Sequence, residues 1–319
     1  MVVRVKPIVT VTPPTNGTIS VAYTLNGETV APEEGKYVYS GTKATVTAAP
    51  DNNYVATDVT AVWTKGEQTG SSGTPNTSKA NGAQQVEKVE INADTTFSAV
   101  FVEKPVVTIG TAAGGTVEVK GTVNDTANTT LETGNHVDFG TDLTITAPPA
   151  NGYVVDKIHN ETVNANKANG AKDKTLEKVG ENAEITATFL AKPKVTITDV
   201  EHGTVTVKGT ADGTEKTLTP GNYVDFGTSL KVTLTPDKGY EVGTMNGVTP
   251  AYTDGTGTTT DNKSYAISNV QNDQTITPVW SAIPTTTVNW SVIDKTPNTD
   301  GGTDGTLKAT VTRKGISSY

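Results

Sequence analysis

The sequence predicts an all-β protein, and three observations support this prediction. First, β-branched residues dominate, with about 61 Thr and about nine Leu among 319 residues; such side chains suit half-buried strands, whereas good helix formers are scarce. Second, apolar residues alternate with Thr in stretches such as 143–147, as in antiparallel strands with one buried face. Third, helical periodicity is never sustained over about ten residues. A βαβ architecture is therefore not expected.

Composition and charge exclude several classes of function. The 34 Asp and Glu outnumber the 25 Lys and Arg, which gives a net charge of −9 that repels nucleic acid and anionic lipid. Cysteine is absent, so disulfides, thiolate metal sites and cysteine nucleophiles are ruled out. No apolar stretch approaches the length of a membrane span, and residues 1–6 lack the apolar core of a signal peptide. We expect no nucleic-acid partner and no membrane insertion within this chain.

Three segments of the chain repeat the same landmarks in register. Each segment opens with a Pro and a Val/Ile/Thr strand, carries two Gly-Thr pairs, places a Tyr 13 positions after the second Gly, and closes with a strand ending in an aromatic residue. An apolar residue follows the Tyr five positions on. In chain order the landmarks are Pro7, Pro105 and Pro193; Gly17, Gly115 and Gly203; Gly41, Gly140 and Gly227; Tyr54, Tyr153 and Tyr240; Val59, Ile158 and Met245; and Phe101, Phe189 and Trp280.

These landmarks predict the division of the chain. Residues 1–6 align with the last strand of a preceding unit, and Pro284 with the Gly305-Thr306 pair opens a fourth unit that ends before its second Gly-Thr. We therefore expect a segment of a longer array. The expected divisions are 1–6, the last strand of a preceding unit; 7–104, 105–192 and 193–283, the first, second and third repeats; and 284–319, the start of an incomplete fourth repeat.

Each repeat has about 90 residues, which is enough for one apolar core. We expect small antiparallel β-sandwich or β-grasp-like domains, because alternation does not reveal strand order. The Tyr residues, the closing aromatics and the pair Phe139 and Phe226 are the large side chains expected to fill the cores. Short Lys-Pro connections favour an extended array over a flexible tether. In the second repeat the expected strands are 106–109, 116–120, 136–139, 142–147, 153–159, 175–179 and 184–189.

The order of motifs in the third repeat resembles the divergent internalin B-repeat class of bacterial repeat domains. The resemblance is carried by the Gly-Thr-Val strand, residues 221–240 and residues 266–280, and in the second repeat by 140–153 and 181–189. It extends over residues 7 to about 282. The first repeat departs most, with Asn53 in place of the Gly before Tyr, and Val59, Ile158 and Met245 stand near the place where the family often carries a Trp after the Tyr. The resemblance implies an extracellular bacterial protein, surface-bound or secreted, whose repeats act as spacers, stalks or adhesive modules without catalytic residues.

No catalytic or cofactor-binding residues are expected from motifs. The three histidines take positions held by unrelated residues in the other repeats: His136 aligns with Tyr37, His159 with Thr60, and His202 with Asn16. They also lack the spacing of metal ligands. Asp138 and Asp225 are equivalent to each other, and Tyr39 replaces them in the first repeat. A repeated Asp of this kind is expected on a solvated strand face or as the anchor of a turn.

The residue types suggest two kinds of ligand, calcium and carbohydrate. Calcium could bind at residues 300–305 or 254–261, which are rich in Asp and Gly but lack EF-hand spacing. Trp63, Trp280 and Trp290 could form a carbohydrate platform. However, Trp280 aligns with the closing aromatics Phe101 and Phe189 and is expected in the core, and the other two are not equivalent. A repeated sugar site is therefore not supported.

The sequence favours a non-enzymatic stalk, spacer or fibre subunit at a bacterial cell surface. Its expected partners are neighbouring repeats or subunits of the same protein. One alternative is an adhesin that binds host or environmental glycans or proteins through the loops between the Tyr and the closing strand, where the repeats differ most in length. Another is an accessory array of a larger cell-wall enzyme.

Overall fold

The computed structural model describes residues 6–65, 68–198, 200–247, 251–252 and 262–284. By its internal contacts the chain divides into two compact units. The first comprises Met1–Pro193 with Tyr223–Phe226, and the second comprises Lys194–Asn222 with Gly227–Tyr319. The first unit contains two β-sandwiches and the second contains one. No described residue is helical.

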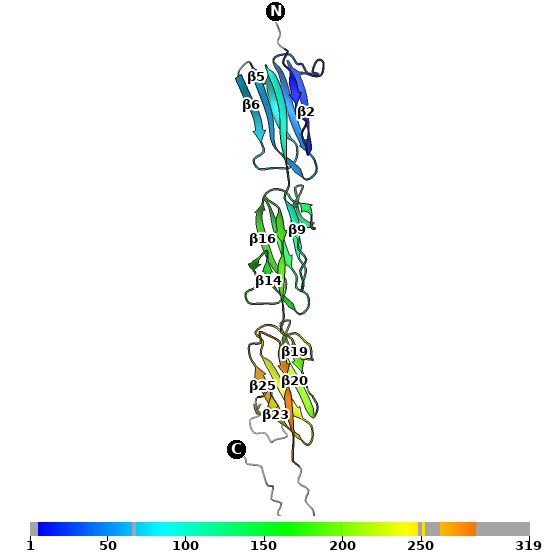
Figure 1. Cartoon of the computed structure of the whole chain (residues 1–319), viewed down its shortest axis with the longest axis vertical. Coiled ribbons are helices and arrows are strands. Elements are labelled where there is room, and N and C mark those ends of the chain that lie inside the picture. The colour runs from blue at the N-terminus through cyan, green and yellow to red at the C-terminus, as the bar shows by residue number, and fades with distance from the viewer. Residues whose placement is uncertain (1–5, 66–67, 199, 248–250, 253–261, 285–319) are drawn as a thin grey trace, which may run out of the picture. The chain divides into compact units, whose positions relative to one another are not determined.

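The first sandwich pairs two four-stranded sheets. One sheet has the order β1 (Val9–Val11), β8 (Asp94–Glu103), β5 (Tyr54–Lys65) and β6 (Gln68–Pro75), with β5 and β6 side by side in Figure 1. The other has the order β3 (Glu28–Val30), β2 (Gly17–Leu25), β4 (Thr42–Pro50) and β7 (Gln84–Ile91). Between the sheets lies a core of aliphatic side chains with the rings of Tyr23 and Phe97, and its aliphatic members include Val46, Ala48, Val59 and Ile91.

The second sandwich repeats this plan. One sheet has the order β11 (Thr126–Leu131), β10 (Glu118–Val123), β13 (Thr141–Ala147) and β16 (Lys172–Val179). The opposite layer consists of β12 (Asn135–His136), β9 (Val106–Ile109) and β17 (Ala183–Ile185), followed by β15 (Glu161–Thr162), β14 (Tyr153–Ile158) and β18 (Ala187–Ala191). Only Thr186 separates β17 from β18, so together they correspond to the single strand β8.

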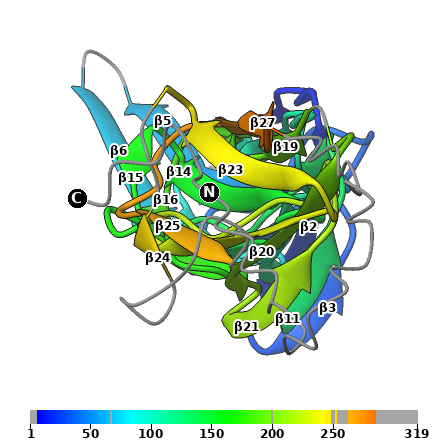
Figure 2. The ribbon, with the colours of Figure 1, turned by 90° about the horizontal axis from the view of Figure 1, so that it is seen from below.

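The third sandwich has the same two layers. Its larger sheet has the order β21 (Thr214–Leu218), β20 (Gly203–Ala211), β22 (Leu230–Pro236), β25 (Lys263–Ile267) and β24 (Ala251–Tyr252). The other layer contains the pairs β19 (Val195–Ile197) with β26 (Gln274–Ile276) and β23 (Tyr240–Met245) with β27 (Pro278–Ala282). In Figure 2, β23 and β27 lie on one side of this domain and β20, β21 and β25 on the other.

The predicted fold class is confirmed, and the sandwich is the form it takes. Every strand expected in the second repeat is present, although β12 and β10 are displaced from the expected ranges by one to three residues. The sequence did not reveal β11, whose Thr- and Asn-rich stretch lacks an apolar alternation, or the two-residue β15. The pairing also differs in one respect: the opening and closing strands run parallel in β1–β8, β9–β17 and β19–β26. The predicted repeat boundaries stay a prediction.

Burial follows the alternation read from the sequence. In β13, Leu143, Ile145 and Ala147 are buried while Asp142 and Thr144 are exposed. The apolar residue five positions after each Tyr is fully buried in every repeat, at Val59, Ile158 and Met245. Removing such side chains from water is the main favourable contribution to the folding of each sandwich.

The two Gly-Thr pairs need glycine for different reasons. At the second pair, Gly41, Gly140 and Gly227 adopt φ values of 77–88°, which side chains with a Cβ rarely tolerate. At the first pair, the closing aromatic ring packs directly on the glycine: Phe101 on Gly17, Phe189 on Gly115 and Trp280 on Gly203. The glycine of the first Gly-Thr pair and the closing aromatic therefore recur together because they pack against each other in every repeat.

The expectation that Phe139 and Phe226 fill the cores is wrong. Both rings are only half-buried, and the hydrophobic cluster of the second sandwich contains Leu143, Ile145 and Ile158 but not Phe139. Tyr54, Tyr153 and Tyr240 are also half-buried. The cores consist mainly of Val, Ile, Leu and Ala, and the closing rings of Phe101 and Phe189 pack against them.

Candidate functional site

A buried lysine lies at the junction between the first and second repeats, immediately before Pro105. The ammonium group of Lys104 donates to Asp138 Oδ1 at 2.9 Å and to Asn124 Oδ1 at 2.7 Å. The side chains of Lys104 and Asp138 are 5% and 12% exposed, so the ion pair is shielded from water. A buried charge of this kind is tolerated only when it is paired and hydrogen-bonded. The Lys-Pro connection is thus fixed to the body of the repeat that it opens.

Asp138 also holds a turn. Its two carboxylate oxygens accept the backbone N–H groups of Asn124 at 3.1 Å and Asp125 at 2.7 Å. These two residues form the turn between β10 and β11, with φ values of 48° and 64°. Of the two roles expected for this Asp, the structure shows the turn anchor, since the side chain is buried and not solvated.

The same pair recurs at the start of the third repeat, and a weaker version stands at the start of the first. Lys192 donates to Asp225 Oδ1 at 3.0 Å, and its side chain is also 5% exposed. Both residues belong to the first compact unit. In the first repeat Tyr39 stands in the Asp position, and Lys6 pairs instead with Glu33, where both side chains are more than 40% exposed. The sequence held a usable signal for this site: Lys-Pro occurs with the repeated Asp in the two later repeats.

The environment of Asp138 stabilises its ionised form. Burial by itself would raise the pKa of this carboxyl, but hydrogen bonds from the Asp125 backbone, Lys104 and Asn81 outweigh it and lower the pKa below 3.8. The group therefore carries its charge at neutral pH and attracts the Lys104 ammonium.

This shift predicts an acid-dependent loss of stability. In the unfolded chain Asp138 titrates near its ordinary value of 3.8, and in the folded protein it titrates lower. Its contribution is therefore fully present above the unfolded pKa and is lost as pH falls through the folded pKa, because the unfolded chain binds the proton first. We expect the stability difference between the protein and its Asp138→Asn variant, measured by urea unfolding, to be constant at neutral pH and to shrink below about pH 4. A difference that stays constant down to pH 3 would contradict the ion pair.

The three histidines lie apart and serve local contacts. His136 Nε2 lies 2.9 Å from Glu103 Oε1, His159 Nδ1 lies 3.0 Å from the carbonyl oxygen of Glu184, and the His202 ring stacks on Tyr240 at 4.1 Å. His159 and His202 have positive φ values, as expected for loop positions. Within the described ranges no group of three or more His, Cys, Asp or Glu is arranged to hold a metal ion.

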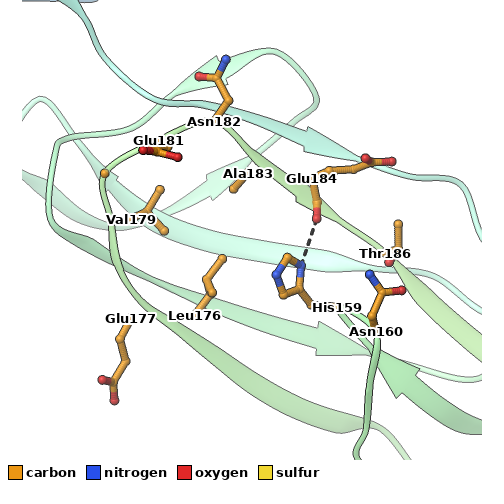
Figure 3. A pocket seen from close by; sticks show the side chains of 11 residues that line it. His159, Asn160, Leu176, Glu177, Val179, Glu181, Asn182, Ala183, Glu184 and Thr186 are labelled. Carbon is orange, nitrogen blue, oxygen red and sulfur yellow. Dashed lines mark hydrogen bonds between the residues drawn. The ribbon is translucent and has the colours of Figure 1, made fainter.

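An open groove of about 670 Å³ runs beside His159 in the second sandwich. Figure 3 shows the His159 ring directed at the Glu184 carbonyl, and Glu177 and Glu181 are among the residues that line the groove. The His159 Nδ1 is occupied by the hydrogen bond to that backbone carbonyl. The groove therefore offers acidic side chains on an open surface but no activated nucleophile.

The other candidate ligand positions have separate outcomes. Both stretches considered for calcium, 254–261 and 300–305, and Trp290 lie outside the described residues. Trp280 packs on Gly203, as expected for a closing aromatic, and Trp63 packs on Gly70 across the β5–β6 pair. Among the residues that the structure describes, none forms a helix long and apolar enough to cross a bilayer.

Comparison with known families identifies the second repeat. Residues 106–193 match the family model of the divergent InlB B-repeat domain. This match confirms the predicted resemblance for these residues, which coincide with the second sandwich from β9 to the Pro that opens the third repeat. No curated protein matches the chain.

Proposed function

We propose, starting from the match of residues 106–193 to the divergent InlB B-repeat family, that the chain is a non-enzymatic spacer in an extracellular bacterial surface protein. The observation that supports this role is the connection between repeats. Lys104 and Pro105 alone separate β8 from β9, and Lys104 is held by a buried ion pair. Pro restricts its own φ, so a two-residue connection of this kind has little conformational freedom. Short, anchored connections suit a protein that holds something at a set distance.

Small-angle scattering of the full chain tests the spacer role. Three repeats of about 12 Å radius of gyration placed end to end are expected to give a maximum dimension of roughly 100 Å. Inserting a flexible Gly/Ser segment between Glu103 and Lys104 should broaden the distance distribution, and the same segment placed in the exposed Asn26-Gly27 turn should not. Scattering from a compact particle, with the repeats folded on one another, would reject the spacer role.

A second candidate function is adhesion through the first sandwich. Its β5–β6 hairpin is much longer than the corresponding β14–β15 pair, and a groove of about 410 Å³ lies beside Trp63, Lys65 and Glu87. An aromatic ring beside polar groups suits stacking of a sugar. Glycan-array binding that is lost in a Trp63→Ala variant would favour this role, and binding that is equal in both proteins would count against it.

A further inference from the structure

Two loops of the protein share a sequence pattern that the spacer role does not explain. Residues 76–82 read Asn-Thr-Ser-Lys-Ala-Asn-Gly and residues 164–170 read Asn-Ala-Asn-Lys-Ala-Asn-Gly. The first loop joins β6 to β7 in the first sandwich, and the second joins β15 to β16 in the second sandwich. Their identical spacing stands out because they lie in the region where the repeats differ most in length. We call them the KANG loops.

The first Asn of each KANG loop folds it into the same shape. The Asn76 amide nitrogen donates to the carbonyls of Ala56 at 3.0 Å and Ala80 at 2.9 Å, and its oxygen accepts the Ala80 N–H at 3.0 Å. Asn164 makes the equivalent three bonds, each at 2.9 Å, to Val155 and Ala168. Both Asn residues are more than 90% buried. The loops are therefore preformed on their own sandwich.

This shape forces the lysine of each loop into an unusual backbone conformation. Lys79 has φ of 52° and Lys167 has φ of 51°. A long side chain rarely adopts this left-handed region, and the conformation costs free energy that the surrounding structure must supply. A Gly or Asn would fit with less strain, so the recurrence of Lys indicates that its side chain is required.

The side chain of each lysine reaches an aromatic ring of the following repeat. The Lys79 ammonium lies 4.1 Å from the centre of the Phe139 ring, and the Lys167 ammonium lies 4.3 Å from the centre of the Phe226 ring. All four residues belong to the first compact unit. These distances are typical of a cation–π interaction. Beside the first contact, the Asn81 amide donates to Asp125 Oδ1 at 3.0 Å.

The rings stand next to the buried carboxylates. Phe139 follows Asp138, and Phe226 follows Asp225. Each acceptor is thus an Asp-Phe pair whose Asp binds the lysine of the connection while its Phe receives the lysine of the KANG loop. This explains why Phe139 and Phe226 are absent from the cores in which they were expected.

The first repeat lacks the Asp-Phe acceptor, and the third repeat lacks the KANG loop that carries the lysine. The first repeat has a KANG loop but carries Tyr39-Ser40 in place of Asp-Phe. The third repeat has Asp-Phe, but residues 253–259 do not contain the KANG pattern, and Ile283 replaces the Lys before Pro284. Only the middle repeat has both. The two parts therefore occur as matched pairs at the two internal junctions.

We propose that the KANG loop and the Asp-Phe pair are a docking code between consecutive repeats. The partner of each Asp-Phe acceptor is the KANG loop of the preceding repeat in the same chain, and the code fixes which repeats can be neighbours and in which order. The proposal goes beyond the spacer role, because it concerns coupling between repeats and holds whatever the array supports.

Distance measurements by pulsed electron paramagnetic resonance on the full chain test the code. The chain has no native cysteine, so spin labels can be placed on cysteines at the exposed positions Lys43 in β4 and Glu118 in β10. We expect one narrow distance distribution in the labelled protein and loss of that narrow peak in the Lys79→Ala and Phe139→Ser variants. Ser is the residue of the first repeat at this position.

The Lys167→Ala variant is the matched control, because it removes the same interaction from the other junction. It should leave the distribution between residues 43 and 118 unchanged. A narrow distribution that survives both Lys79→Ala and Phe139→Ser would overturn the proposal, as would a broad distribution in the labelled parent. If Phe139→Ser disturbs folding, as judged by circular dichroism, Lys79→Ala decides alone, since Lys79 lies in a loop outside the core. Compact scattering would reject the spacer role without affecting this result.

Discussion

Replacing Lys104 by Met is expected to reduce the free energy of unfolding of the second repeat by about 3–5 kcal/mol. Met fills a similar volume but leaves the Asp138 carboxylate buried without its counter-charge. Removing one partner of a buried ion pair costs far more than the pair itself contributes, because the remaining charge has lost its solvation. Amide hydrogen exchange in β13 of the full chain reports the opening of this repeat and provides the measurement.

The Lys6→Met variant is the matched control for this experiment. Lys6 occupies the same position before a Pro, but its partner is the exposed Glu33. Exposed ion pairs contribute little to stability because water screens them, so exchange in the first sandwich should hardly change. Equal effects of the two substitutions would show that burial at Lys104 has no energetic consequence. Proteolytic peptides joined through Lys104 and Asn124 with the loss of one ammonia would also contradict the ion pair, because the Lys104 amine would then have displaced the amide nitrogen of Asn124.

Replacing Gly115 by Ala is expected to destabilise the second repeat by about 1–3 kcal/mol. A Cβ at this position would overlap the Phe189 ring and lie 2.6 Å from the carbonyl oxygen of Pro148. The ring can turn, but the carbonyl belongs to the neighbouring backbone and can move only if the strand moves. Overpacking of this kind raises the energy of the folded state without changing the chemistry of the residue. Urea unfolding of the full chain measures the loss of stability. Amide hydrogen exchange in β18 assigns that loss to the second repeat.

The Gly110→Ala variant separates this steric effect from a general cost of replacing glycine. Gly110 lies in the same repeat, and its nearest neighbour would be 3.4 Å from the new Cβ. We expect little loss of stability, or a small gain from the lower entropy of the unfolded chain. A loss equal to that of Gly115→Ala would mean that contact with Phe189 is not the reason for glycine at position 115.

The repeats made most of the fold predictable. Alternation in 143–147 identified the buried face of β13, and the apolar positions that recur at Val59, Ile158 and Met245 are all fully buried. These inferences succeed because period-2 patterning and burial have the same physical cause. The parallel pairing of opening and closing strands could not be predicted from the sequence, because it joins residues about 80 positions apart and leaves no local pattern.

The site was harder to predict than the fold. Phe139 was assigned to the core because a large aromatic residue usually lies there, whereas its environment is set by Lys79 from another repeat. The sequence left two roles open for Asp138, a solvated strand face or a turn anchor, and its burial depends on contacts with Lys104 and Asn124 that only the folded chain forms. The sequence shows which residues recur. The contacts that explain the recurrence join residues far apart in the chain, so they can be identified only in the folded structure.

The parallel pairing of the opening and closing strands has a mechanical consequence. Val9, Thr10 and Val11 pair in register with Thr95, Thr96 and Phe97, and the backbone bonds from Thr95 to Ile8 and from Thr12 to Phe97 tie the same two strands. When a tensile force draws the two ends of one repeat apart, parallel neighbours slide along each other, so these bonds bear the load together. In an antiparallel pair joined by a turn, the same force would instead break the backbone hydrogen bonds one after another. Each repeat is thereby arranged to resist pulling along the chain more strongly than its modest core would suggest.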